Sequence, residues 1–399
     1  MSVEVRPLGV KCNISCHYCY QNSIRTMGGN AKEYDLDQIK EAVLAKGGPF
    51  ALFGGEPLLM PLHDLADLFA WGFERFGSSS IQTNAVLLTD EHIKLFKRFK
   101  VGVGVSIDGP DECNSARWAG SVVKTSRATA KIERALETLL SCGIRPSVIT
   151  TLNRFNATAA MLPRLIDWFR FLDRIGIPFA RIHLLEVDSS SVRESLALSE
   201  SENASAMLAL GELERKELKT LKFDMFREIK ALLLANDKEV SCVWRACDAY
   251  ATEAVQGIEG HGEASNCGRT NKAGVDYVKA DANGFERYLA LYWTPQEHGG
   301  CKDCRFFLMC KGQCPGTSID GDWRNRTEHC GVWFRLFEHV ETLLCEDGYV
   351  PVSQDRNRLA LEGAMLAEWA QCRNPTLTKV LERMRVLAFT KPTVDPVVS

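Results

Sequence analysis

The sequence predicts an α/β protein: a curved, open barrel of six β/α repeats, then a small loop-rich segment and a helical C-terminal tail. Three observations support this prediction. Short apolar runs alternate with longer amphipathic segments up to about residue 190, glycine and cysteine become frequent after about residue 240, and helical periodicity returns after residue 351. At 399 residues the chain is long for one domain, and we expect domains at 1–236, 237–350 and 351–399.

The barrel prediction depends on the order of strands and helices. The strand candidates are short and apolar: residues 3–10, 50–54, 79–84, 101–107, 146–152 and 180–187. The segments between them have helical spacing of apolar residues: 36–45, 61–76, 89–99, 125–141 and 157–175. Parallel strands need crossovers, which usually are helices, so the pattern predicts a parallel sheet covered by helices. Six repeats are too few to close an eight-stranded barrel, which leaves the predicted barrel open.

The rest of the chain has a different character. Residues 196–235 are rich in charge and predict one or two helices that lead out of the barrel. Residues 267–330 offer little apolar material for a core, and bound metal would stabilise them in a reducing compartment. Residues 358–371 and 377–389 again predict helices.

Charge and hydropathy exclude several functional classes. The 48 Lys and Arg nearly balance the 51 Asp and Glu, so nothing electrostatic favours nucleic acid as a partner. No apolar run approaches the roughly 18 residues that span a bilayer. The first residues carry no basic patch followed by an apolar stretch, so no secretion signal is evident. We therefore expect a cytoplasmic protein with neither a membrane nor a nucleic-acid partner.

The chain contains 15 cysteines, an odd number, and they are unevenly placed. A cytoplasm keeps thiols reduced, which favours metal or redox chemistry over disulfides. Four isolated cysteines suit the ordinary interpretation of small apolar residues: Cys113, Cys142, Cys345 and Cys372.

The first cysteine group follows the first predicted strand directly. Cys12, Cys16 and Cys19 have the spacing C-x3-C-x2-C. Three thiolates on one loop can bind three irons of a [4Fe–4S] cluster, which normally takes four cysteines. The fourth iron is then open, as catalytic zinc sites keep a free position. A zinc site and three reduced structural thiols are the alternatives.

This spacing resembles the radical S-adenosylmethionine (SAM) superfamily, whose signature CxxxCxΦC has an aromatic residue where Tyr18 stands. Further motifs follow at successive strand ends: GGEP at 54–57, QTN at 82–84 and SIDGP at 106–110. Each alone could be a turn or a helix cap. In the family, such positions receive the ammonium, ribose and carboxylate of SAM, and an arginine suits the carboxylate. The resemblance implies the following cofactor-binding residues: Tyr18, Gly54, Gly55, Glu56, Pro57, Gln82, Asn84, Ser106, Asp108 and Arg117.

The resemblance also implies a chemistry. The amino and carboxylate groups of SAM would chelate the open iron, and one electron from the cluster would release a 5′-deoxyadenosyl radical. That radical would remove a hydrogen atom from an unactivated carbon of the substrate, while the protein supplies placement and excludes quenchers. An external electron donor such as flavodoxin or ferredoxin is implied as a partner.

A second cysteine group, C-x2-C-x5-C-x3-C followed by one more cysteine, resembles the SPASM domain, although zinc is an alternative. SPASM relatives bind two auxiliary [4Fe–4S] clusters, so the resemblance implies three clusters in all. One would take Cys301, Cys304, Cys310 and Cys330. The other would take Cys314 with Cys242, Cys247 and Cys267. Leu289 stands where relatives carry a cysteine, so this cluster either uses these ligands or keeps an open site.

SPASM members mostly modify peptides and proteins. Our main expectation is a peptide maturase that abstracts hydrogen and oxidatively crosslinks side chains, as in the maturation of ribosomal peptide natural products. The alternatives are formylglycine formation by a sulfatase maturase, a dehydrogenase or mutase acting on a small molecule, and an iron–sulfur electron carrier without enzymatic activity. Sulfatase-maturing relatives carry an Asp after an auxiliary cysteine, but Gly268 follows Cys267, although Cys247 and Asp248 form such a pair.

Two expectations concern substrate handling. Glu186 and Asp188 end the sixth predicted strand and are candidates for the catalytic base, with a solvated loop carboxylate as the alternative. The first predicted strand begins at residue 3, so we expect a separate protein or the barrel mouth to recognise a precursor peptide.

Overall fold

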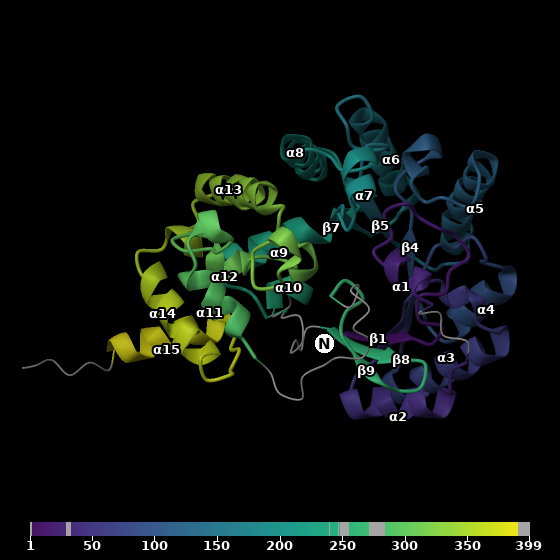
Figure 1. Cartoon of the computed structure of the whole chain (residues 1–399), viewed down its shortest axis with the longest axis horizontal. Helices are drawn as coiled ribbons and strands as arrows, with labels where there is room; N and C mark the ends of the chain where they lie inside the picture. The colour runs from purple at the N-terminus through teal and green to yellow at the C-terminus, as the bar shows by residue number, and fades with distance from the viewer. Residues whose placement is uncertain are drawn as a thin grey trace, which may run out of the picture.

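The protein is described by a computed structural model for residues 2–28, 33–238, 240–245, 247, 255–270 and 284–389, with backbone only for residue 2 and residues 385–389. In this part of the chain nine strands form one sheet in the order β7-β6-β5-β4-β3-β2-β1-β8-β9 (Figure 1). All neighbouring strands are parallel except β8 and β9. The strands are β1 Ser2–Arg6, β2 Phe50–Leu52, β3 Ser80–Thr83, β4 Gly102–Ser106, β5 Ser147–Leu152, β6 Phe179–Leu184, β7 Lys222–Phe223, β8 Val255–Glu259 and β9 Ala264–Ser265.

The predicted fold class is confirmed. Strands β1 to β6 follow one another in the sheet as they do in the chain, with helices between them, and β7 does not pair with β9 in the described residues. The sheet is therefore an open partial barrel. The α-helices are α1 Asn22–Thr26, α2 Leu36–Lys46, α3 Leu62–Phe76, α4 Asp90–Arg98, α5 Val122–Ser141, α6 Leu162–Ile175, α7 Ser190–Ser195, α8 Glu200–Lys216, α9 Asp224–Leu233, α10 Cys242–Arg245, α11 Glu286–Trp293, α12 Phe307–Cys310, α13 Cys330–Glu346, α14 Arg358–Trp369 and α15 Leu377–Phe389.

Local sequence signals explain where several of these helices begin and end. Asp35 accepts hydrogen bonds from the Asp37 and Gln38 backbone at the start of α2, and Ser199 with Glu202 forms a capping box at α8. Gly176 caps the C-terminus of α6, and its left-handed φ of 95° suits glycine. The five helices that the sequence predicts in the barrel half are all present, and most of their ends lie within a few residues of the predicted ends.

Three strands, β7, β8 and β9, were not predicted. β8 lies in the segment expected to be loop-rich, and it pairs in parallel with β1 from Ser2 opposite Val255 to Arg6 opposite Glu259. Its sequence, VQGIE, has only two apolar residues, but the whole strand is buried between β1 and β9. Tertiary pairing thus decides this strand rather than its own propensity.

Helices α11 to α15 pack beside the barrel and are drawn in green to yellow in Figure 1. Helix α13 contacts α8 and α9, which lead out of the barrel, and α11 and α15 contact α14. The Trp244 ring lies 5.4 Å from Trp333 and 5.7 Å from Phe337 of α13, in edge-to-face arrangements. Strands β8 and β9 lie after residue 236 but belong to the same sheet as the barrel strands. The domain boundaries at 236 and 350 therefore stay a proposal.

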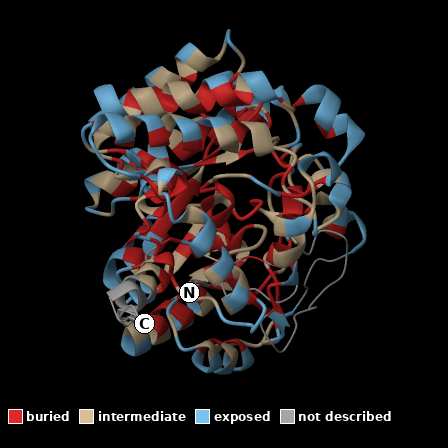
Figure 2. Cartoon of the chain, turned by 90° about the vertical axis from the view of Figure 1, so that its left-hand side faces the viewer, coloured by how far each residue is buried: buried red, intermediate tan, exposed pale blue. Residues whose placement is uncertain are grey.

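Buried residues lie along the strands and the inward faces of the helices, while exposed residues cover their outer faces (Figure 2). Among the described residues no helix has the length and apolarity needed to cross a bilayer.

Candidate functional site

A cavity of about 730 Å³ lies along the inner face of the sheet, between the strand ends and the C-terminal half of the chain. It brings together residues that are far apart in sequence. Of the predicted site residues, those that line it are Cys12, Cys16, Cys19, Tyr18, Gly54, Gly55, Gln82, Asn84, Ser106, Arg117, Glu186, Cys242, Cys247, Cys267 and Cys314. Those that do not line it are Glu56, Pro57, Asp108, Asp188, Cys301, Cys304, Cys310 and Cys330.

The first cysteine loop follows β1 and faces the cavity. Two N–H groups donate to its sulfurs: Asn84 Nδ2 to Cys12 Sγ at 3.8 Å and Arg25 Nη2 to Cys19 Sγ at 3.9 Å. Burial raises the pKa of Cys16 to about 12, so this thiol must lose its proton when a metal binds. Hydrogen bonds to ligand sulfurs are a usual feature of iron–sulfur sites, so this loop suits a cluster.

The GGE segment at the end of β2 packs against the chain that leads into the cysteine loop. Gly55 N donates to Gly9 O at 3.0 Å and Glu56 N donates to Lys11 O at 2.9 Å. A Cβ at Gly55 would lie 2.0 Å from Lys11 O, so only glycine permits this approach. The glycines therefore place the cysteine loop directly.

Glu56 is engaged within the protein. Its Oε1 accepts from Thr83 Oγ1 at 2.6 Å and Leu58 N at 3.0 Å, and its Oε2 accepts from Asn84 N at 2.7 Å. Burial raises the pKa of Glu56, and these hydrogen bonds oppose the shift. Only 1% of the residue is exposed, so it joins the ends of β2 and β3 instead of facing the cavity.

Tyr18, Asp108 and Arg117 form one buried network. Tyr18 Oη donates to Asp108 Oδ2 at 2.5 Å, and Arg117 Nη1 donates to Tyr18 Oη at 3.1 Å. Asp108 also accepts from Thr151 N at 3.0 Å and is fully buried. Arg117 Nε has no hydrogen-bond partner within the described residues, and Arg117 lines the cavity. The network thus holds the Arg117 guanidinium at the wall of the cavity.

Gln82 and Ser106 face the cavity from adjacent strands, and Gln82 Nε2 donates to Ser106 Oγ at 2.8 Å. Gly104 makes room for this contact, because a Cβ there would lie 2.1 Å from Gln82 Oε1. Asn84, predicted to contact a ribose, lines the cavity and donates to Asn13 Oδ1 at 2.7 Å as well as to Cys12 Sγ.

The later cysteines that were predicted as ligands differ in whether they line the cavity. Cys242, Cys247, Cys267 and Cys314, the inner set, line the cavity. Burial raises the pKa of Cys247, and Cys242, Cys314 and Cys267 raise it further through their charges. The four thiols therefore lie in one neighbourhood. Asp248, which could follow an inner ligand as a base, lies outside the described residues.

The outer set consists of Cys301, Cys304, Cys310 and Cys330. Burial raises the pKa of Cys310, and the charges of the other three raise it further. Within the described ranges, no three Cys, His, Asp or Glu side chains lie close enough to share one metal ion. Zinc needs four ligands on one ion, whereas each thiolate of a [4Fe–4S] cluster binds a different iron.

Glu186, Arg269 and His183 form a charged group that lines the cavity beside the inner set. Of the three, only Glu186 was predicted as a site residue. Arg269 Nε lies 3.5 Å from Glu186 Oε2, and Arg269 Nη2 lies 3.0 Å from His183 Nδ1. Glu186 is 4% exposed, whereas Asp188 is exposed. No sequence motif marks Arg269 or His183. His183 lies on β6 and Arg269 lies in the loop after β9, so they become neighbours only when the chain folds.

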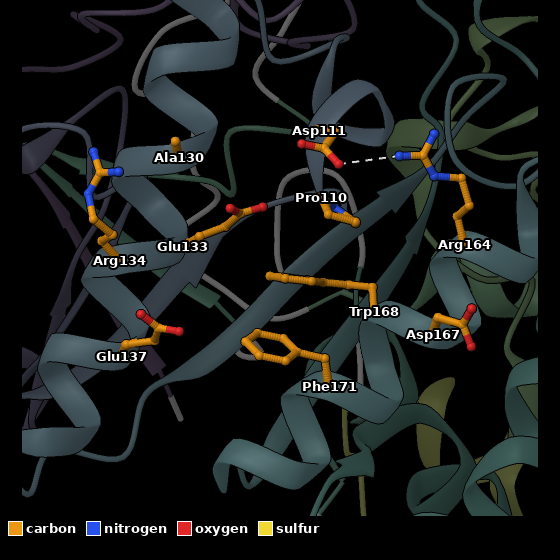
Figure 3. Close-up of a pocket in the computed structure, with 10 residues that line it drawn as sticks. All are labelled: Pro110, Asp111, Ala130, Glu133, Arg134, Glu137, Arg164, Asp167, Trp168 and Phe171. Carbon is orange, nitrogen blue, oxygen red and sulfur yellow. Dashed lines mark hydrogen bonds and ion pairs between the residues drawn. The ribbon is translucent and has the colours of Figure 1, made fainter.

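A second cavity, of about 530 Å³, lies outside the sheet against α5 and α6. Figure 3 shows its stacked Trp168 and Phe171 rings and the ion pair between Asp111 and Arg164, at 3.3 Å. None of the predicted site residues lines it, so the inner cavity is the candidate active site.

Comparison with known proteins agrees with this geometry. Residues 7–169 match the model of the radical SAM superfamily. A cysteine-type anaerobic sulfatase-maturating enzyme of Clostridium perfringens is 30% identical over 386 residues, covering 85% of this chain and 96% of the relative. The chain belongs to the radical SAM superfamily. Its relatives place it with the SPASM-type members.

Solved structures share the fold of this radical SAM enzyme. anSMEcpe with bound AdoMet superposes with a TM-score of 0.66 at 19% identity, covering 86% of this chain and 98% of the other. Streptococcus suis SuiB bound to the precursor peptide SuiA gives 0.54 at 14% identity, covering 82% and 75%. Membership of the superfamily implies a [4Fe–4S] cluster and SAM as cofactors.

Proposed function

We propose that this radical SAM maturase oxidises a cysteine or serine side chain of a peptide or protein to an aldehyde, as in formylglycine formation. The single observation that carries the proposal is the shared cavity: the first cysteine loop and the inner cysteine set face the same space of about 730 Å³. The match to a sulfatase-maturating enzyme over 96% of its length supports the choice of this reaction.

The proposed ligands follow from the placement of the thiols. Cys12, Cys16 and Cys19 would hold the SAM-binding cluster, and the inner and outer sets would hold two auxiliary clusters. When bound, the cluster and SAM supply a 5′-deoxyadenosyl radical that takes a hydrogen atom from the substrate. Arg117, which lines the cavity, is our candidate to bind the carboxylate of SAM, and an external flavodoxin or ferredoxin would supply the electron.

The carbon that bears the thiol or hydroxyl would lose a hydrogen atom, and the resulting radical would then lose one electron, which an auxiliary cluster would accept, and the proton of its thiol or hydroxyl. Serine would give the aldehyde directly, whereas cysteine would give a thioaldehyde that water hydrolyses to the aldehyde with release of hydrogen sulfide. Glu186 is our candidate for the proton acceptor, because it lines the cavity and lies beside the inner cysteine set. The Arg269 guanidinium, 3.5 Å away, provides its counter-charge. Asp188 is exposed and lies outside the cavity lining, which leaves Glu186 as the better placed of the two carboxylates.

Oxidative crosslinking of a peptide is the second candidate. Gly268 follows Cys267 where sulfatase-maturing relatives carry an aspartate, and this departure favours a different use of the cavity. The fold shared with SuiB is compatible with it. Both candidates need the same initial loss of a hydrogen atom.

The test uses the reconstituted enzyme under anaerobic conditions with SAM, a reductant and peptides that carry one cysteine or one serine. Formylglycine gives an aldehyde that a hydrazine reagent captures, whereas a crosslink removes two hydrogens without an aldehyde. Glu186→Gln should continue to form 5′-deoxyadenosine but lose peptide product, and the exposed Glu194→Gln serves as its control. Formation of 5′-deoxyadenosine with every peptide left unchanged would refute both candidates.

A further inference from the structure

Four residues on neighbouring strands form one row across the inner face of the sheet. The register places Glu4 of β1 beside Ala51 of β2, Ala51 beside Ser80 of β3, and Ser80 beside Gly102 of β4. All four line the cavity. Closed β/α barrels fill such layers with bulky branched side chains. Here the row beyond Glu4 contains nothing larger than serine, which leaves an unfilled space, the lower chamber, in front of the Glu4 carboxyl.

The lower chamber lies below most of the predicted SAM contacts, of which Gln82, two residues beyond Ser80 on β3, is the nearest along the strands. Those contacts cluster at the carboxyl ends of the strands, whereas Gly102 begins β4 and Ser106 ends it. The four residue steps from Gly102 to Ser106 span roughly 13 Å. Arg145, Ser147 and Phe179, at the amino ends of β5 and β6, also line the cavity, so the space continues along the full strand length.

Glu4 lies in a charged region of the cavity that also contains Arg145 and the Cys267 thiol. The electrostatic neighbours of Glu4 include Arg6, Arg181 and Arg269, and each of these has its own acidic partner. Arg6 pairs with Glu259 at 2.6 Å, Arg181 with Asp224, and Arg269 with Glu186 at 3.5 Å. No hydrogen bond or close ion pair to the Glu4 side chain occurs within the described part of the chain.

We propose that the lower chamber is a binding subsite for a basic side chain of the peptide substrate, with Glu4 as the counter-charge for its ammonium or guanidinium. Small walls admit the long aliphatic part of lysine or arginine, and one unshared carboxylate receives its charged end. The peptide nature of the ligand rests on the proposed function, whereas the cation preference of the chamber does not.

The first experiment measures the chamber without turnover. We would titrate the reconstituted holoenzyme with hexylammonium and with hexanol, its uncharged counterpart, by isothermal calorimetry. Hexylammonium should bind about tenfold or more tightly than hexanol, the usual size of a charge-assisted hydrogen bond. Glu4→Gln should remove this difference, and the exposed Glu74→Gln should retain it.

A second variant protects the test against misfolding of the first. Gly102→Leu would fill the chamber from the start of β4, where a Cβ would meet only Ser80 Cβ at 3.4 Å and Ser79 O at 3.8 Å. It should weaken both probes. Equal binding of amine and alcohol by the wild type, an amine preference that survives in Glu4→Gln, or undiminished binding of both probes by Gly102→Leu would overturn the proposal.

The second experiment concerns the substrate. Peptides with a single cysteine and either lysine or norleucine at scanned positions would be compared for the kcat/KM of modification. Lysine should be favoured about tenfold at one spacing from the cysteine, and Glu4→Arg should reverse the preference toward glutamate at that position. If no peptide is modified, the proposed function fails while the calorimetric comparison still decides the chamber. If peptides are modified without any lysine preference, the subsite is refuted and the function stands.

Discussion

Glu56 accepts three hydrogen bonds inside the protein, although the sequence predicts that it faces a ligand. Two of the three donors belong to the end of β3, and the third belongs to the turn after Glu56 itself. A carboxylate suits this position because it has enough lone pairs to accept from all three groups. Its position implies that it determines where the strand ends lie, and through them where the cysteine loop lies.

Glu56→Gln should therefore destabilise the fold. The amide nitrogen of glutamine cannot accept, so at least one of the buried donors from Thr83, Asn84 and Leu58 loses its partner. The expected loss in the free energy of unfolding is about 1–3 kcal/mol, measured by urea denaturation. The exposed Glu74→Gln should change it by less than about 0.5 kcal/mol. An unchanged midpoint for Glu56→Gln would contradict the structural role.

His183 gives the fold a dependence on pH. Burial lowers the pKa of His183 well below its usual value, and the neighbouring Arg269 and Arg181 lower it further. Because the pKa is lower in the folded than in the unfolded chain, this contribution to stability is present above about pH 6.5 and is lost as the pH falls. The free energy of unfolding should fall by up to about 1.4 kcal/mol per pH unit in this range.

The measurement compares urea denaturation of the wild type and His183→Gln at about pH 7.5 and about pH 5.5. The Gln side chain can accept from Arg269 as the neutral imidazole does, but it does not titrate. The variant should therefore show a smaller loss of stability between the two pH values. Parallel losses in both proteins would show that His183 is not the titrating group.

At the scale of elements, the pairing of β1 with β8 joins the barrel to the later part of the chain. Arg6, at the end of β1, pairs with Glu259 at the end of β8 at 2.6 Å, and their side chains are 5% and 9% exposed. Arg6 Nη2 also donates to Ser265 Oγ and to Asn266 O, just before Cys267. The strand before the first cysteine loop and the loop of an inner cysteine are therefore connected by one buried guanidinium.

Removing one member of the Arg6–Glu259 pair should lower the free energy of unfolding far more than half as much as removing both members together. Arg6→Met leaves Glu259 as a buried unpaired charge, and Glu259→Leu leaves Arg6 in the same condition. Each single variant should lose about 3–5 kcal/mol in the free energy of unfolding. The double variant should lose less than the sum of the two, which a double-mutant cycle in urea would detect. Additive losses would mean that the two side chains act independently.

Sequence reasoning succeeded where the pattern is local. The alternation of apolar runs predicts β1 to β6 in order, and capping residues such as Asp35 and Ser199 explain where helices start. It missed β8 because VQGIE is identified as a strand only by its neighbours β1 and β9. The same limit applies to the site. Motif positions bring Cys12, Gly54, Asn84 and Ser106 to one edge of the sheet, but which side chains bond one another depends on contacts between strands.

At the scale of the whole molecule, the three cysteine groups differ in what they face. The first loop and the inner set line the cavity, whereas the outer set of Cys301, Cys304, Cys310 and Cys330 does not. Only the first two can meet a substrate in that cavity directly. The outer set lies among α11, α12 and the start of α13, where the aromatic residues Tyr292, Phe306, Phe307 and Phe334 form ring contacts.

Iron analysis of reconstituted variants tests the assignment of the outer set. The wild type should bind about twelve irons per chain, as three [4Fe–4S] clusters, and Cys310→Ala should lose up to about four of them. Cys345→Ala removes an exposed thiol outside all three groups and serves as the control. Unchanged iron in Cys310→Ala, or zinc at this position in the wild type, would overturn the assignment of the outer set.

The backbone pairing around the first cysteine loop has a consequence for how the active site can vary. Ser15 N donates to Trp118 O at 2.7 Å and His17 N donates to Ala116 O at 2.8 Å, so Cys16 and Arg117 lie on two segments tied by main-chain groups. Peptide groups are present whatever the side chains are, so these two hydrogen bonds do not depend on the identity of the side chains in the surrounding walls. Selection can therefore reshape the substrate compartment while the machinery that generates the radical keeps its alignment.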